Sequence, residues 1–299
     1  MNCNRRSVIQ SLMGGSLLLP GILSELLGNE SSSDGDIDPL APRRSHFEPR
    51  AKRVIFLNMS GGASHVDSFD YRPKLFADHN KSYQVPEKML EAFALNNRVV
   101  EKYFKRPQWE FKQRGESGLW ISDLFPHVAE CADDICLIRS MRNDHADHFQ
   151  ATLGIHTGSV TFARPSIGAW VSHGLGTLNQ NLPSFLVLAP QMPYAGAQVW
   201  ASDFLPGCHQ GTHVAPGPDP MPNIKRQQSA TELQELELGL AQAFNRRHLA
   251  ARPGDADLTA RIKSFETAFG MQVAAPEAFD LSKETDATHQ LYGLPRGST

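Results

Sequence analysis

Three short, mainly apolar runs predict buried β-strands in this chain. They occupy residues 54–59, 135–138 and 183–188, and each is bordered by polar or turn-forming residues. Aliphatic and aromatic residues dominate these runs, without the strict alternation of a half-exposed strand. Continuous apolar runs of this length are typical of parallel strands that are covered on both faces.

Helical patterns lie between and after these runs. The predicted helices cover residues 87–95, 124–132, 149–155, 165–174, 231–247 and 258–273. Pro126 and Pro165 are suited to first helical turns, Gly158, Gly174 and Gly176 to helix ends, and Asp257 to an N-cap. The mixture of strands and helices predicts an α/β fold with a mainly parallel central sheet flanked by helices.

Polar side chains follow the first predicted strand. They are Ser60, Ser64, His65, Asp67 and Asp70, with Gly61 and Gly62 among them. In open α/β sheets ligands bind at the carboxyl ends of strands, and glycine lets the backbone approach a ligand closely. We therefore expect a ligand contact here; the alternative is a glycine turn with solvated polar residues.

A second polar cluster, residues 139–148, follows the second predicted strand and contains His145 and His148. His148 is expected near the start of a helix, where backbone N–H groups favour anions. Arg164 is a candidate oxyanion ligand, because guanidinium matches phosphate and sulfate, or else an ion-pairing residue at a helix start. His173, His209 and His213 are expected to be structural or exposed.

The N-terminal segment predicts export. Arg5 and Arg6 precede an uncharged stretch from Ser7 to Ser24, which is the layout of a twin-arginine signal. Residues 1–28 are therefore interpreted as a signal or membrane anchor, although short for a spanning helix. The alternative is an ordinary amphipathic helix. Residues 29–50 are interpreted as a flexible linker and residues 51–299 as the α/β domain.

Composition narrows the classes of function. A formal net charge of −3 argues against a nucleic-acid-binding protein, and a hydrophobic fraction of 40% is typical of a globular domain. The four cysteines show neither C-x-x-C pairs nor zinc-ligand spacing. The sequence therefore predicts no disulfide framework.

Several stretches together resemble a bacterial family of exported proteins, domain-of-unknown-function family 1501. They are Met59–Asp67, Ser117–His127, His156–Gly158, Arg164–Ser172, Asn181–Ser184 and Ala268–Gln272. By resemblance this family belongs to the alkaline phosphatase and sulfatase superfamily. The resemblance places His148 where that superfamily carries its Cys, Ser or Thr nucleophile, and His65 and Asp67 near a metal-binding Asp.

The resemblance implies an exported, metal-dependent hydrolase of phosphate or sulfate esters. The implied metal is a divalent ion such as zinc, manganese or calcium, held by His65, Asp67 and His145, with His148 as the catalytic residue. Ser60, Gly61, Gly62, Ser64 and Arg164 are the expected substrate contacts. The expected partner is an anionic small molecule or a glycan ester, in the periplasm or cell envelope.

Two departures from the superfamily open a second hypothesis. The sulfatase Cys-x-Pro-Ser-Arg signature is absent. The Asp-x-His cluster that the resemblance to longer family members implies would be expected downstream of Thr299. We therefore expect impaired hydrolysis in this chain. The alternative is a non-catalytic envelope protein that binds a glycan or a protein partner.

Overall fold

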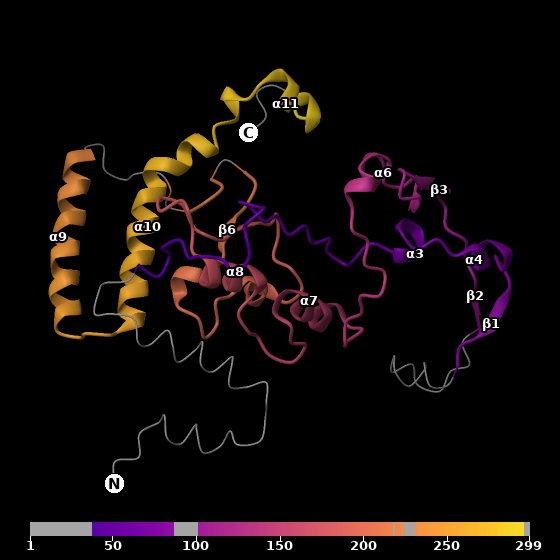
Figure 1. The fold of residues 1–299 in the computed structure, drawn as a ribbon, viewed down its shortest axis with the longest axis horizontal. Helices are drawn as coiled ribbons and strands as arrows, with labels where there is room; N and C mark the ends of the chain where they lie inside the picture. The colour runs from indigo at the N-terminus through magenta and orange to yellow at the C-terminus, as the bar shows by residue number, and fades with distance from the viewer. Residues whose placement is uncertain (1–37, 87–100, 218, 223, 225–230, 296–299) are drawn as a thin grey trace, which may run out of the picture. The chain divides into compact units, whose positions relative to one another are not determined.

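The structure is a computed structural model that describes residues 38–86, 101–217, 219–222, 224 and 231–295 (Figure 1). The chain divides into two compact units, Met1–Asp38 and Pro39–Thr299, and all elements below belong to the second. The expected export segment and the helix predicted at residues 87–95 lie outside the described residues. No helix in the described part is long and apolar enough to cross a membrane.

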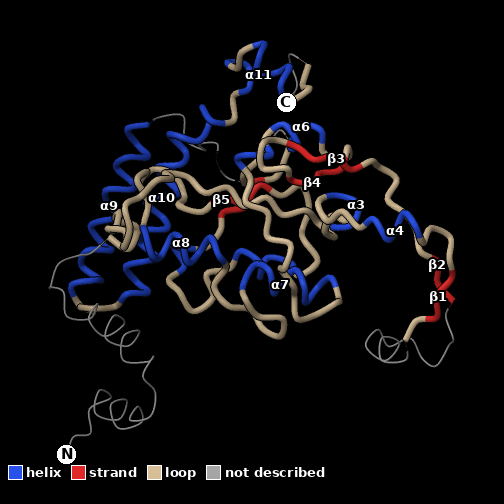
Figure 2. The backbone as a smooth tube through the Cα atoms, turned by 45° about the vertical axis from the view of Figure 1, so that its right-hand side comes forward, coloured by secondary structure: helices blue, strands red, loops and turns tan. Residues whose placement is uncertain are grey.

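The strands form three separate two-stranded sheets (Figure 2). The antiparallel pairs are β1 (Ser82–Gln84) with β2 (Glu101–Tyr103) and β3 (Phe111–Arg114) with β4 (Leu119–Ser122). The parallel pair is β5 (Leu186–Leu188) with β6 (Thr212–Val214). The fold is thus mixed α/β, and the prediction of a mainly parallel central sheet is wrong for the described residues.

Two of the three predicted strands are not strands. Residues 54–59 and 135–138 carry no strand assignment, and the side chains of Ile55 and Leu57 are 81% and 86% exposed. A β-strand depends on hydrogen bonds to a neighbouring strand, and neither run is paired with one among the described residues. An apolar run by itself therefore did not produce a strand.

The helices agree better with the sequence prediction. They are α3 (His65–Ser68), α4 (Pro73–Ala77), α6 (Pro126–Glu130), α7 (His148–Thr157), α8 (Ile167–Leu175), α9 (Thr231–Ala250), α10 (Ala256–Ala278) and α11 (Asp286–Leu291). Short 3₁₀ helices are η2 (Ala132–Asp134), η3 (Gly196–Trp200), η4 (Gly207–His209) and η5 (Leu281–Lys283). The N-cap of α10 is Asp255, not Asp257, because its side chain accepts a hydrogen bond from the Leu258 N–H.

The C-terminal end of α8 contacts residues 40–43, which precede the first predicted strand. Gly176 has a positive φ of 66°, and a Cβ there would lie 2.0 Å from the carbonyl oxygen of Ala41. The N–H of Arg43 donates to the Leu175 carbonyl, and the N–H of Thr177 donates to the Leu40 carbonyl, both at 2.9 Å. Leu40 is only 2% exposed, so this part of the expected linker packs against α8.

Three small hydrophobic clusters make up the described core. One joins α10 to β6 and the segment after it, and contains Val214, Met221, Ile224, Met271 and Ala275. The second joins α7 to η3 through Leu153, Ala195, Val199 and Trp200. The third joins β4 to α6 and η2 through Ile121, Ala129 and Ala132.

Candidate functional site

The glycine loop expected at the site leads directly into α3. The N–H of Gly62 donates to the Met59 carbonyl at 2.9 Å, and Gly61 and Gly62 have positive φ angles of 78° and 73°. These angles suit glycine, because a Cβ atom would strain the turn. The turn is followed by α3, whose Ser68 hydroxyl donates to the Ser64 carbonyl at 2.8 Å. The loop therefore positions the short helix that carries His65.

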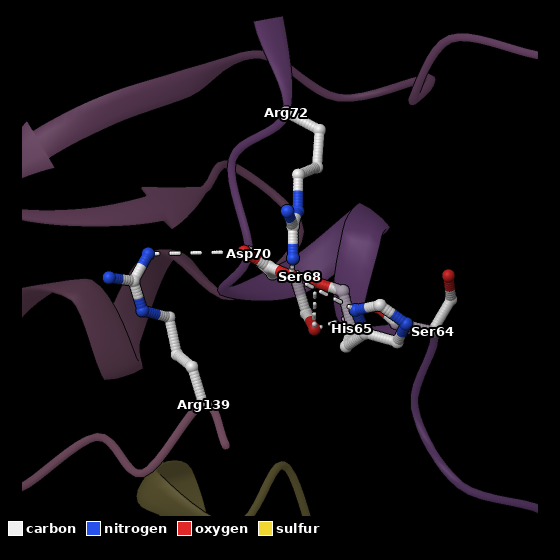
Figure 3. A network of polar contacts seen from close by, with 6 residues as sticks. All are labelled: Ser64, His65, Ser68, Asp70, Arg72 and Arg139. Carbon is white, nitrogen blue, oxygen red and sulfur yellow. Dashed lines mark hydrogen bonds and ion pairs between the residues drawn. The ribbon is translucent and has the colours of Figure 1, made fainter. Parts of the chain in front are cut away.

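Asp70 is the centre of the polar network at the end of α3. Its side chain is 10% exposed, and its Oδ2 atom accepts hydrogen bonds from Arg72 Nε at 2.9 Å and Nη2 at 2.6 Å. His65 Nδ1 lies 3.3 Å from the same oxygen, and Arg139 Nη1 lies 3.9 Å from Oδ1. In Figure 3 Arg72, His65 and Arg139 approach the carboxylate from different sides. We call these four residues the Asp70 network.

The electrostatics of the Asp70 network favour the charged carboxylate. The hydrogen bonds from Arg72 lower the pKa of Asp70 below its ordinary value, desolvation opposes this effect, and His65 adds to the lowering. Two guanidinium groups then face one carboxylate, so the charges of Arg72, Arg139 and Asp70 sum to a net positive charge. The side chains of Arg72 and Arg139 are 59% and 60% exposed, so both cations also face solvent.

The structure separates His65 from its expected partner. His65 and Asp67 lie two positions apart in α3, and side chains at this spacing on a helix do not face each other. Asp70 lies just beyond the helix and contacts His65, because the backbone N–H of Asp70 donates to the His65 carbonyl at 2.8 Å. The expected substrate contacts are exposed: Ser60, Gly61, Gly62 and Ser64. Among the described residues, no hydrogen bond joins them directly to Asp70, Arg72 or Arg139. Ser64 is linked to the network only as the chain neighbour of His65 and through the hydrogen bond from Ser68.

His145, His148 and Arg164 make other contacts. His145 Nδ1 accepts the Asp147 N–H at 3.1 Å, and the ring centroid of His148 lies 5.3 Å from that of Tyr194. The guanidinium of Arg164 lies over the Phe162 ring at 5.2 Å. No described hydrogen bond, ion pair or ring contact connects these three residues to the Asp70 network. The structure therefore does not bring the predicted site residues together.

A metal ion would need several ligands at one place. Within residues 38–295, apart from the undescribed stretches, no group of three or more His, Cys, Asp or Glu side chains could hold one. His65 uses Nδ1 on Asp70, and His145 uses Nδ1 on a backbone N–H. The described residues thus do not form a metal shell, and the divalent metal stays a prediction.

Comparison with known proteins assigns the chain to a family. Residues 51–299 match the family described as "Protein of unknown function (DUF1501)". The chain belongs to the DUF1501 family. Comparisons with curated proteins and with solved structures found no match.

This DUF1501 chain contains a second polar network, which the sequence did not predict. The Ser172 hydroxyl lies 2.8 Å from His209 Nδ1 and 2.6 Å from the Ser184 hydroxyl, and His209 Nε2 lies 3.4 Å from His173 Nδ1. We call these four residues the His209 network. His209 comes from η4, Ser172 and His173 come from α8, and Ser184 lies just before β5.

Burial sets the charge state of the His209 network. His209 is 1% exposed, and desolvation lowers its pKa to about 4, with further lowering by His173 and Arg43. Desolvation and Arg43 also lower the pKa of His173. A neutral His209 can donate at one ring nitrogen and accept at the other, which suits a hydroxyl on one side and an imidazole on the other. The Ser172 hydroxyl is buried with His209, so these two side chains satisfy each other's hydrogen bonding inside the fold.

Proposed function

We propose that this DUF1501 protein binds phosphate or sulfate ester groups at the Asp70 network. The observation that carries the proposal is the presence of two half-exposed guanidinium groups on either side of one buried carboxylate. Guanidinium presents N–H groups in a planar fork that matches the oxygens of these anions.

The Asp70 carboxylate would orient the two arginines and leave most of their N–H donors available to a bound anion. The two hydrogen bonds of Arg72 to Oδ2 use two of the five N–H donors of a guanidinium group. Arg139 lies 3.9 Å away, beyond ordinary hydrogen-bonding distance, so its donors remain for a ligand. The anion would therefore find donors that are already placed, which lowers the entropic cost of binding.

The finer proposal is hydrolysis of the bound ester in the cell envelope, as the resemblance implies. His65 is the side chain best placed to act as a base, since Asp70 contacts its Nδ1 atom and the ring is otherwise exposed. With the proton on Nδ1, the Nε2 lone pair would accept a proton from a water that attacks the ester phosphorus or sulfur. The bond from that atom to the alcohol oxygen would break, and Nε2 would return the proton to the departing alcohol. Arg72 and Arg139 would stabilise the negative charge on the other ester oxygens.

The binding step is tested with inorganic sulfate, p-nitrophenyl phosphate and p-nitrophenyl sulfate by titration calorimetry. Arg139→Gln should weaken binding by about 10- to 150-fold, since a hydrogen bond to a charged group contributes about 1.5–3 kcal/mol. Arg142→Gln, an exposed arginine of the same segment, is the matched control and should bind as the parent does. Equal affinity of the parent, Arg139→Gln and Arg72→Gln would contradict the proposed site.

The hydrolytic step is tested separately by release of p-nitrophenol. His65→Gln should remove turnover while leaving the affinity for sulfate within about twofold, because glutamine keeps a polar group at this position without acting as a base. His148→Ala tests the residue that the resemblance selects. Loss of turnover in His148→Ala alone would assign catalysis to His148 and contradict the role of His65.

A non-catalytic envelope protein is the second candidate. It is favoured by the separation of His145 and His148 from His65, because no described contact joins these expected metal-binding and catalytic side chains. This candidate predicts ester binding without p-nitrophenol release in every variant.

A further inference from the structure

One face of α9 is apolar and exposed. Leu233, Leu236, Leu240 and Phe244, which we call the leucine stripe, are 46%, 71%, 61% and 62% exposed. Their spacings of three, four and four residues keep them on one side of an α-helix. Four large apolar side chains in a row are more than the scattered surface leucines of an ordinary helix.

The opposite face of α9 packs against α10. Gln234 Nε2 donates to Gln272 Oε1 at 2.6 Å, and Gln242 Nε2 donates to Glu266 Oε1 at 3.2 Å. Leu238, between these two glutamines on the same face, is half-buried. At 3.6 residues per turn this face is turned roughly 150° from the leucine stripe. The stripe therefore points away from α10, which lies alongside α9 in Figures 1 and 2.

The charges along α9 are segregated. Its first half carries Glu232, Glu235 and Glu237, and its last turns carry Arg246, Arg247 and His248. A second α9 lying parallel would put like charges together at both ends. An antiparallel one would put the acidic half of each helix against the basic half of the other, and would also oppose the helix dipoles favourably.

We infer that the leucine stripe is the contact surface for a second copy of this chain, with the two α9 helices antiparallel. The twofold axis passes near Leu240, so that Leu240 meets its own copy and Leu236 meets Phe244 of the second copy. Glu232 then lies on the same flank of the helix pair as Arg247 of the second copy, and at nearly the same level. Such a contact is isologous and closes as a dimer, and it does not depend on the proposed ester binding.

Sedimentation velocity of the full chain over a range of concentrations tests the dimer. The parent should sediment as a dimer, and Leu240→Glu should raise the dimer dissociation constant at least a hundredfold, because two carboxylates would meet at the axis. Val273→Glu is the matched control: Val273 is 57% exposed on α10 and outside the stripe, so this variant should remain a dimer. Circular dichroism should show that both variants keep the parent's helix content.

Cross-linking through introduced cysteines tests the orientation. Leu236→Cys chains mixed with Phe244→Cys chains should form the mixed disulfide in large excess over either homodimeric disulfide. Parent chains under the same oxidant control for the native thiols, among them the exposed Cys131 and Cys136. Preferential Leu236→Cys self-pairing would show parallel helices. That result, a monomeric parent or a dimeric Leu240→Glu variant would overturn the inference.

Discussion

The Asp70 network and the His209 network both contain histidine, but they differ in charge and in burial. The former places a nearly buried carboxylate among cations that reach solvent, whereas the latter centres on the buried Ser172 and His209, with His173 and Ser184 partly buried beside them. Both central groups have a lowered pKa, but for opposite reasons. For Asp70 the lowering favours the charged form, because Arg72 donates to it. For His209 it favours the neutral form, because burial removes water from the imidazolium.

This contrast separates binding from stability. Cations that remain half-exposed keep their charge and can meet an anionic ligand, while a buried neutral imidazole can only pack and hydrogen-bond. We therefore expect changes to the His209 network to affect folding most, and changes to the Asp70 network to affect binding most.

The largest effect on stability should come from His209→Ala. The substitution removes a buried ring and its hydrogen bonds to Ser172 and His173, and should lower the free energy of unfolding by about 3 kcal/mol. His127→Ala is the control, because the His127 side chain is 92% exposed, and should change stability by less than about 0.5 kcal/mol. Urea denaturation measures both. Equal losses in the two variants would show that His209 is not a stabilising centre.

The next effect is a loss of stability in acid. The folded pKa of His209 lies near 4, below the 6.5 of an ordinary histidine, so the unfolded chain binds a proton first as the pH falls. The stability that neutral His209 contributes is present above about pH 6.5 and is lost as the pH falls from about 6.5 to 4. Between pH 7 and 4.5 it should reduce the free energy of unfolding by about 2 kcal/mol.

His173 acts in the same direction, because its folded pKa is also lowered. Urea denaturation at several pH values measures the slope, and His209→Asn, which keeps a polar side chain that does not titrate, should flatten it. An unchanged slope in this variant would assign the acid sensitivity to other groups.

The smallest effect on stability should come from Asp70→Asn. Its cationic partners are largely exposed, so the loss should be about 1 kcal/mol or less. Because the folded pKa of Asp70 is lowered, its contribution is present above about pH 4 and is lost as the pH falls through the folded value. The difference in urea stability between variant and parent should therefore be constant from pH 7 to 5. Asp67→Asn, in the same short helix, is the matched control.

The sequence predicted much of the helical structure, because helix ends are set by local residues. Asp147 caps α7 by accepting the Phe149 N–H, Gly158 ends it with a φ of 73°, and Ser166 caps α8. Each of these contacts joins residues within a few positions of one another. The same local signals were less accurate at α10, where Asp255 rather than Asp257 is the cap.

The site was predictable only in part. The sequence analysis selected His65 as a metal ligand together with Asp67, whereas the helical turn of α3 directs the Nδ1 atom of His65 to Asp70. Arg139 reaches that network from a segment far along the chain, and His209 meets Ser172 across 37 positions. No local pattern indicates such pairs, because the fold alone brings the segments together.

By itself, then, the sequence indicated helices at α6, α7, α8, α9 and α10, the glycine turn at Gly61 and Gly62, and membership of the DUF1501 family. The tertiary structure decided which apolar runs are strands. Residues 186–188 gained a parallel partner in β6, while residues 54–57 remain exposed. Both runs are apolar enough for a sheet, but a strand is completed by hydrogen bonds to a second segment. The same holds for charge: burial and partners, both set by tertiary contacts, hold His209 neutral and keep Asp70 ionised.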